Sequence, residues 1–205
     1  MTDVGPEVLG RGPTRAGTRR AELVAVATRL FRERGYHGVG MRAIAEAAHI
    51  QAASLYHHFA GKEELLLESI YVVDRDLVVD QLPLLEGSGT RPERLQELVE
   101  GHVRHIGTNR DAWWVAGREL RALSPERFDE VQVYRRRYQH AIAEFLAAGT
   151  AAGEFDCPDP RLSALALLDM LNGPNEWYEP GGRLDIDELA ARYVDLALRL
   201  VGCCA

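Results

Sequence analysis

The chain has 205 residues, 46% of them hydrophobic, which is enough to bury one large core or two small ones. Its longest apolar run, 163–168, is far shorter than the ~18 residues that suggest a membrane span. The net charge of −7 argues against nucleic-acid binding until that charge is divided along the chain.

The charge is distributed unevenly. Residues 1–62 contain nine Lys and Arg against five Asp and Glu, a net charge of +4, whereas residues 63–205 contain 15 against 26, a net charge of −11. A basic N-terminal third on an acidic remainder suits a DNA-reading head on a body with another task. An N-terminus without an apolar signal region, and three cysteines without metal-ligand spacing, predict a cytoplasmic protein.

Residues 1–17 are rich in Gly, Pro and Arg and show no periodicity, so we interpret them as a flexible arm. The arginines at 11, 15, 19 and 20 are candidates for contacts with phosphate or the minor groove, and the first two suit a merely solubilising tail equally well. A first helix is expected from Thr18, as N-cap, to Gly35. Its buried stripe should consist of Leu23, Ala27, Leu30 and Phe31.

Residues 41–62 predict two short helices joined by a tight turn. One apolar face of the first helix is formed at i, i+3, i+4 and i+7 by Met41, Ile44, Ala45 and Ala48. Leu55 and Phe59, spaced i and i+4, can pack back on that face. This leaves small and hydrogen-bonding side chains in front, as a recognition helix requires, although the helix pair alone favours an ordinary hairpin in a core.

Four segments carry a more specific signal: LFRERGY at 30–36, MRAIAEAA at 41–48, SLYHHF at 54–59 and KEELL at 62–66. Together they resemble the DNA-binding domain of the TetR (tetracycline-repressor-like) family over residues 18–71. The resemblance implies an all-α fold with an N-terminal three-helix helix-turn-helix domain. Residues 72–205 would then form a C-terminal helical domain for ligand binding and dimerisation.

The resemblance also implies roles for single residues of the head. Tyr56, His58 and Lys62 are carried over as phosphate contacts, with Ser54 and His57 facing the groove. A phenol, an imidazole and a Lys at a helix start are each able to bind phosphate oxygens. The remaining candidates for DNA contact on the exposed surface are Arg42, Gln51, Ala52 and Ala53, of which the two alanines offer only apolar contact, for example to thymine methyl groups.

The head departs from the family pattern at Gly40, His49, Gln51 and Ala53. Gly is a good N-cap and His tolerates positive φ, so the first two changes should cost little. Gln51 stands where a capping Ser or Thr is usual. We expect its side chain to form a bidentate contact with adenine instead.

The body is predicted to be helical throughout. A helix from Lys62 should run to Leu85, before Gly87, Ser88 and Gly89, and act as the lever between head and body. Helices are also expected at 91–108 and 111–123, followed by a long helix that Ser124 and Pro125 start and that reaches about Gly149.

A partly apolar cavity between these helices is where a small effector would enter a body without catalytic motifs. The candidates for its lining are His102, His105, Trp113, Trp114, Phe128, Tyr134, Tyr138, Met170 and Trp177. Aromatic residues at helical spacing are usually core, and Trp177 suits the partner subunit equally well. The arginine run 135–137 reads as a solvated face or, at a cavity mouth, as a site for phosphates of an anionic ligand.

The last two helices predict a homodimer. A helix from about Pro160 is apolar nearly all round and should be buried on two sides, until Gly173 and Pro174 end it near Asn172. The final helix opens with a capping box of Asp185 with Glu188. Two copies of this helix pair suggest a four-helix dimer interface, as the resemblance also implies.

The segment from Phe145 to the C-terminus loosely resembles the C-terminal domains of TetR-family regulators of fatty-acid and sterol catabolism, some of which sense acyl-CoA thioesters. We therefore predict a dimeric transcriptional regulator, released as a repressor from a palindromic operator by a small effector that is a candidate acyl-CoA thioester. The alternatives are a ligand-sequestering dimer and a helical enzyme, both without DNA binding. The sequence predicts no catalytic residues, no metal site and no cofactor.

Overall fold

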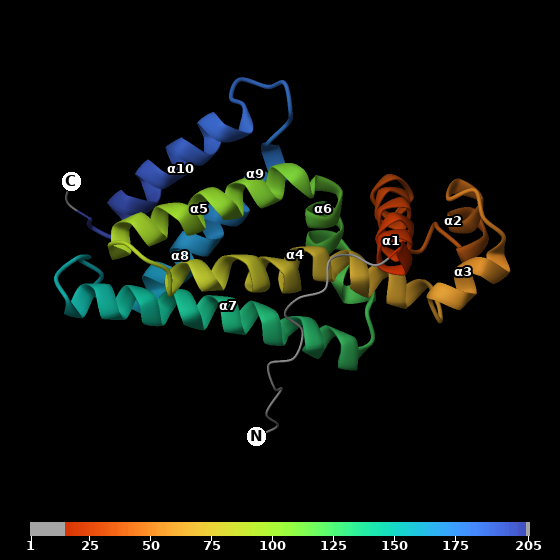
Figure 1. The fold of residues 1–205 in the computed structure, drawn as a ribbon, viewed down its shortest axis with the longest axis horizontal. Helices are drawn as coiled ribbons and strands as arrows, with labels where there is room; N and C mark the ends of the chain where they lie inside the picture. The colour runs from red at the N-terminus through yellow and green to blue at the C-terminus, as the bar shows by residue number, and fades with distance from the viewer. Residues whose placement is uncertain (1–14, 204–205) are drawn as a thin grey trace.

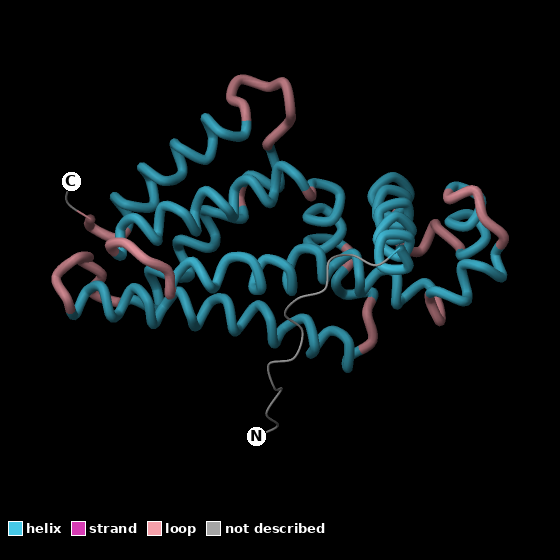
Figure 2. The backbone as a smooth tube through the Cα atoms, in the orientation of Figure 1, coloured by secondary structure: helices cyan, strands magenta, loops and turns pink. Residues whose placement is uncertain are grey.

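The computed structural model describes residues 15–203, and within that range the chain forms helices and loops but no strand (Figure 2). The helices are α1 (Arg15–Arg34), α2 (Met41–Ala47), α3 (Ala52–His58), α4 (Lys62–Leu85), α5 (Arg91–Thr108), α6 (Arg110–Arg118), the 3-10 helix η1 (Leu120–Ala122), α7 (Pro125–Ala151), α8 (Pro160–Asn172), α9 (Pro174–Trp177) and α10 (Ile186–Leu200). The all-α prediction is confirmed. None of the described helices has the length and hydropathy needed to cross a bilayer.

The head consists of α1, α2 and α3 at one end of an elongated molecule (Figure 1). All four residues of the predicted α1 stripe are buried, and so are the apolar anchors Ile44, Leu55 and Phe59 of the two short helices. These side chains fix α3 against α1 and α2 because burying each large apolar group contributes about 1.5–3 kcal/mol. The opposite surface of α3 remains in solvent.

The body is formed by long helices that run back and forth away from the head (Figure 1). The helices α4 and α7 lie side by side and both lead away from the head, α5 returns on α4, and α10 packs mainly on α5. The helix α8 packs against α7, and the short α6 lies where the body meets α1. A single helix, α4, belongs to both parts, so the boundary expected after residue 71 falls inside a continuous helix.

Helix boundaries follow their capping signals in most places. The box of Asp185 with Glu188 is formed at the start of α10, and Thr90 with Glu93 forms a second box at the start of α5. Two boundary predictions are wrong. The helix α1 begins at Arg15, so Thr18 lies within it, and the predicted helix 111–123 is split into α6 and η1. Residues 1–14, most of the predicted arm, lie outside the described range.

In the single chain the helix α8 is buried on one side, and the expected burial of its other side depends on a second copy of the chain. Its Ala164, Leu167 and Leu171 are fully buried, whereas Leu162 is 61% exposed and Leu165 is 43% exposed. On α10, Leu196 is 46% exposed. Both helices of the predicted interface therefore present leucines to solvent.

Candidate functional site

The turn between α2 and α3 is built around His49. Its backbone has φ 54°, the left-handed conformation that the resemblance implied for this position, and it is the one non-glycine residue with positive φ among residues 15–203. The Ile50 N–H then donates to the Ala45 carbonyl oxygen at 2.9 Å, which closes the turn. The exposed imidazole of His49 shows why a residue with a side chain is accepted where glycine is more usual.

The outer surface of α3 carries most of the predicted DNA contacts. Gln51, Ala53, Tyr56 and His57 are exposed, and Arg42 is exposed on α2. Ala52, Ser54 and His58 are half-buried. Gln51 occupies the N-cap position with extended backbone, but its side chain makes no capping hydrogen bond. The amide is thus available for a partner in front of the helix, while its role as an adenine reader stays a prediction.

The far end of α3 is held by Arg20 of α1. One guanidinium nitrogen donates to the His58 carbonyl oxygen, and the other reaches Glu64 at 2.7 Å and Glu68 at 3.0 Å on α4. The guanidinium also lies over the Phe59 ring, 4.1 Å from its centroid. Arg20 therefore connects α1, α3 and α4, so it orients the recognition helix rather than extending toward DNA.

Lys62 is placed inside the head more deeply than its predicted role suggested. Its ammonium donates to the Tyr36 carbonyl oxygen at 2.8 Å and lies 4.1 Å from the centroid of the Tyr36 ring. Lys62 has three N–H donors, of which this contact uses one. Its contact with phosphate remains a prediction.

A cavity of about 330 Å³ lies in the body between α4, α5, α6, α7 and α8. Its volume is at the lower end of ligand sites, and it is lined by aliphatic, aromatic and uncharged polar groups, one ion pair and one further carboxylate, Asp169. The lining consists of Val73, Asp74, Leu77, His102, Trp113, Ala116, Gly117, Tyr134, Arg135, Tyr138, Gln139, Leu165, Leu168, Asp169, Asn172 and Asn175.

His102 is the central polar group of this cavity. It is 1% exposed, its Nδ1 lies 3.3 Å from the Tyr138 hydroxyl, and its Nε2 lies 3.2 Å from Asn172 Oδ1. Burial, and secondarily the neighbouring His105, lowers the pKa of His102 to about 3. The imidazole is therefore neutral at physiological pH, with one nitrogen as donor and the other as acceptor.

An ion pair forms another part of the cavity wall. Arg135 donates to both carboxylate oxygens of Asp74, from Nε at 2.8 Å and from Nη2 at 3.1 Å. Burial raises the pKa of Asp74, and the attraction of Arg135 opposes that rise. Of the arginine run 135–137, this residue alone reaches the cavity, and Arg136 and Arg137 are exposed. The run is thus mainly a solvated face, and its one inward member is already paired.

Of the nine predicted lining residues, the structure brings His102, Trp113, Tyr134 and Tyr138 together around the cavity. The other five lie elsewhere. His105 sits behind Trp113 and accepts its Nε1–H at 3.1 Å. Trp114 is half-buried beneath Arg118, and Trp177 is 55% exposed. The remaining two, Phe128 and Met170, pack against the core.

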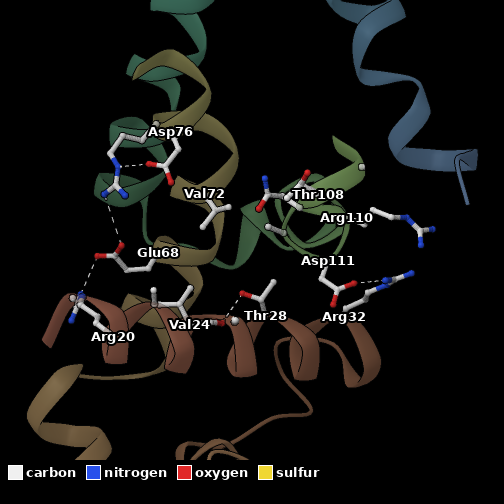
Figure 3. Close-up of a pocket in the computed structure, with 17 residues that line it drawn as sticks. Arg20, Val24, Thr28, Arg32, Glu68, Val72, Asp76, Thr108, Arg110 and Asp111 are labelled. Carbon is white, nitrogen blue, oxygen red and sulfur yellow. Dashed lines mark hydrogen bonds and ion pairs between the residues drawn. The ribbon is translucent and has the colours of Figure 1, made fainter. Parts of the chain in front are cut away.

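A second, larger cleft of about 700 Å³ separates the head from the body between α1, α4 and α6 (Figure 3). Its floor contains Val24, Thr28 and Val72, and charged side chains from all three helices surround it (Figure 3). Arg32 of α1 forms an ion pair with Asp111 of α6 across one end of the cleft (Figure 3). Its carboxylates and arginines are largely paired with one another, so this cleft is a junction between two parts rather than a preformed anion site.

Comparison with known proteins identifies the family to which the two parts of the chain belong. Residues 23–69 match the family described as "Bacterial regulatory proteins, tetR family". Residues 88–201, more than half of the chain, match "Tetracyclin repressor-like, C-terminal domain". The chain belongs to the TetR family. It is therefore a DNA-binding transcriptional regulator, not an enzyme, and the resemblance found in the head is confirmed.

Relatives within the TetR family include KstR2 regulators and AibR. The transcriptional repressor KstR2 of Rhodococcus jostii is 30% identical over 182 residues, which cover 88% of this chain and 89% of that protein. The ketosteroid transcriptional regulator KstR2 of Mycobacterium tuberculosis has a solved structure with a TM-score of 0.73 at 27% identity, covering 96% of this chain and 99% of the other. The structure of AibR in complex with isovaleryl coenzyme A and operator DNA has a TM-score of 0.75 at 26% identity, covering 87% of this chain and 97% of the other.

Sequence reasoning missed several residues of this TetR-family cavity, above all Asp74, Gln139, Asn172 and Asn175. Single polar residues in a helix usually face solvent, so they carried no signal of their own. The pair of asparagines on either side of Gly173–Pro174 was the one available hint, because a helix break is where polar side chains can turn inward.

Proposed function

We propose that this protein is a dimeric repressor that an acyl-CoA thioester releases from a palindromic operator, and that it controls genes of lipid or sterol catabolism in the cytoplasm. The relatives KstR2 and AibR support the choice of branch and effector class. The observation that carries the release mechanism is the position of α6, which lines the body cavity and is also ion-paired to the head.

The connection runs along α6 in three steps. Trp113, Ala116 and Gly117 line the cavity, so an occupant touches α6 directly. Two residues before Trp113 on the same helix, Asp111 pairs with Arg32 of α1. If α6 can occupy two positions, a ligand that binds the protein more tightly in one of them shifts the equilibrium toward that position. The shift in free energy equals the difference between the two binding free energies, and the head moves with α6.

One further contact ties the end of α6 to the head, and a second ties the start of α7 to the start of α4. The Tyr36 N–H donates to Glu119 Oε1 at 3.1 Å, and the Ser124 N–H, just before α7, donates to Glu63 Oε1 at 2.7 Å. The hydrogen bond from Ser124, with the nearby Arg127, lowers the pKa of Glu63 and keeps it ionised. Displacement of α6 would change the spacing of two recognition helices in a dimer and break their register with the half-sites.

The exposed leucines of α8 and α10 support dimerisation through these helices. An apolar surface of this kind is costly in a monomer and gains stability when a second copy covers it. One head offers few base-reading groups, so a dimer on half-sites about one helical turn, roughly 34 Å, apart would also be needed for specificity.

The test is fluorescence anisotropy with the DNA just upstream of the protein's own gene, beside a scrambled duplex and at several salt concentrations. We expect tight, salt-sensitive binding to the upstream DNA and weakening by an acyl-CoA thioester, typically 5- to 150-fold for a coupling of ~1–3 kcal/mol. Tyr56→Ala should weaken DNA binding, whereas the matched exposed change Val133→Ala in α7 should not, the two side chains being 54% and 55% exposed.

Asp111→Asn separates release from binding. It removes the charge that pairs with Arg32 but leaves the cavity and α3 unchanged, so thioester binding should persist while release from DNA is reduced. Equal release in Asp111→Asn and the unmodified protein would refute the Asp111–Arg32 ion pair as the connection between α6 and the head. No DNA binding at low salt would instead favour a ligand-sequestering dimer.

A further inference from the structure

The hydrogen bonds around His102 have a definite direction. At neutral pH its ring carries one proton, and Asn172 Oδ1, which lies 3.2 Å from Nε2, can only accept. The proton is therefore on Nε2, and Nδ1 accepts from the Tyr138 hydroxyl at 3.3 Å. Tyr138 is fully buried and burial raises the pKa of its phenol, so the hydroxyl keeps the proton that it donates.

The hydrogen bonds from Tyr138 to His102 and from His102 to Asn172, here called the Tyr138–His102 relay, leave one donor group unused at the cavity. Asn172 accepts from His102 through Oδ1, so its Nδ2 carries two N–H donors, and that nitrogen has no partner within the part of the chain that the structure describes. In the single chain the residue as a whole is exposed although it lines the cavity, so it lies at the opening, at the end of α8 opposite the exposed Leu162. An oriented donor at an opening suits a ligand acceptor.

The helix break at Gly173–Pro174 is flanked by two asparagines, Asn172 and Asn175. The helix α8 ends at Asn172, and α9 begins at Pro174, whose ring nitrogen cannot donate to the preceding turn. Asn175 on the other side of the break also lines the cavity, and its Nδ2 donates to the Trp113 carbonyl oxygen at 3.4 Å. The two residues that flank the break therefore both contribute an amide to the cavity lining.

The size and charge of the cavity limit what can enter. At ~30 Å³ for each water-sized volume, 330 Å³ holds on the order of ten non-hydrogen atoms, which suits an acyl group but not a nucleotide. The Asp74–Arg135 pair is internally neutralised, His102 is uncharged and the remaining charged lining residue, Asp169, is a carboxylate, so no free positive charge awaits a phosphate. The entering part of the ligand should be uncharged.

We infer that Asn172, held by the Tyr138–His102 relay, donates its amide N–H to the thioester carbonyl oxygen of the effector, with the acyl group inside the cavity and the coenzyme A portion outside. This inference rests on the proposed function, because it assigns the recognised atom of the same effector. It makes Asn172 the residue that distinguishes a thioester from a ligand of the same shape without the carbonyl group.

The experiment uses pairs of ligands that differ in this oxygen alone. Butanoyl-, isovaleryl- and hexanoyl-coenzyme A are each compared with the S-alkyl thioether in which a methylene replaces the carbonyl group. Binding to the full-length protein is measured by isothermal titration calorimetry. One hydrogen bond between neutral groups corresponds to roughly three- to tenfold in affinity, so at least one thioester should bind tighter than its thioether by that factor.

Two variants and a control assign the preference to Asn172. Asn172→Asp keeps an oxygen for His102 Nε2–H but replaces the donor with an acceptor, and Asn172→Ala removes the donor without adding charge. Both should bring the affinity ratio of thioester to thioether close to one. Gln139→Glu places the same new charge on the cavity wall outside the relay and should keep the ratio, even if both affinities fall.

Equal binding of thioester and thioether by the unmodified protein, or a ratio that survives in both Asn172 variants, would overturn the assignment. Binding of the upstream DNA without binding of any thioester in the series would also overturn it, while leaving the DNA-binding regulator intact. Loss of both DNA and thioester binding would instead refute the proposed function itself.

Discussion

Acidification should destabilise this protein through His102, and the size of the effect follows from its burial. The folded state holds the pKa of His102 at about 3, against about 6.5 in the unfolded chain, so below pH ~6.5 the unfolded state binds more protons. The corresponding stability is fully present at higher pH and is lost as the pH falls from ~6.5 toward 3. Between pH ~7 and ~5 this group alone should lower the free energy of unfolding by about 2 kcal/mol.

The variant His102→Gln isolates this contribution, because an amide keeps one donor and one acceptor for Tyr138 and Asn172 but does not titrate. The free energy of unfolding is measured in urea by far-UV circular dichroism, at fixed protein concentration because a dimer is involved. The variant should lose about 2 kcal/mol less than the unmodified protein on acidification from pH ~7 to ~5. Exposed His140 on α7 provides the control, His140→Gln, which should follow the unmodified protein. Parallel pH dependence in the His102 variant would refute the reasoning.

Three further changes test the packing, the interface and the head. Gly107→Ala would place a Cβ 2.7 Å from the Ile186 side chain and should cost about 1–3 kcal/mol in a thermal melt, whereas Gly117→Ala, with its nearest atom at 3.6 Å, should be tolerated. Leu162→Glu should convert the dimer to a monomer in analytical ultracentrifugation, and a persistent dimer would place the interface elsewhere. Arg20→Ala should weaken operator binding about tenfold or more in anisotropy titrations without loss of helix content, and unchanged affinity would contradict its role in holding α3.

The sequence determined most of the helical framework, because the signals for it are local. Capping residues, glycines and prolines acted within a turn or two of their position, whereas the left-handed turn at His49 was expected from the resemblance to the TetR family, whose pattern usually has Gly there. The stripe along α1 was predictable for the same reason, since helical periodicity says which side chains share a face. The splitting of the predicted 111–123 helix into α6 and η1 was not predicted, because the one glycine in that stretch, Gly117, lies within α6 and one residue before its end.

Periodicity does not say which neighbour covers a helical face, and this limited the prediction of the site. Trp113 and Trp114 are adjacent in sequence, yet one lines the cavity and the other stacks beneath an arginine. The ion pair of Asp74 with Arg135 joins residues 61 positions apart in the chain. From the sequence alone, a single Asp or Arg in a helix is normally expected to face solvent.

The sequence by itself thus determined most of the helices, the family of the DNA-binding head and the charge asymmetry of the chain. Only the tertiary structure decided that Arg20 orients α3, that α6 connects the cavity to the head, and that His102 has a neutral partner on each side. These properties depend on contacts between helices that are distant in the chain. Such contacts are set by the packing of whole faces and leave no pattern within any single segment.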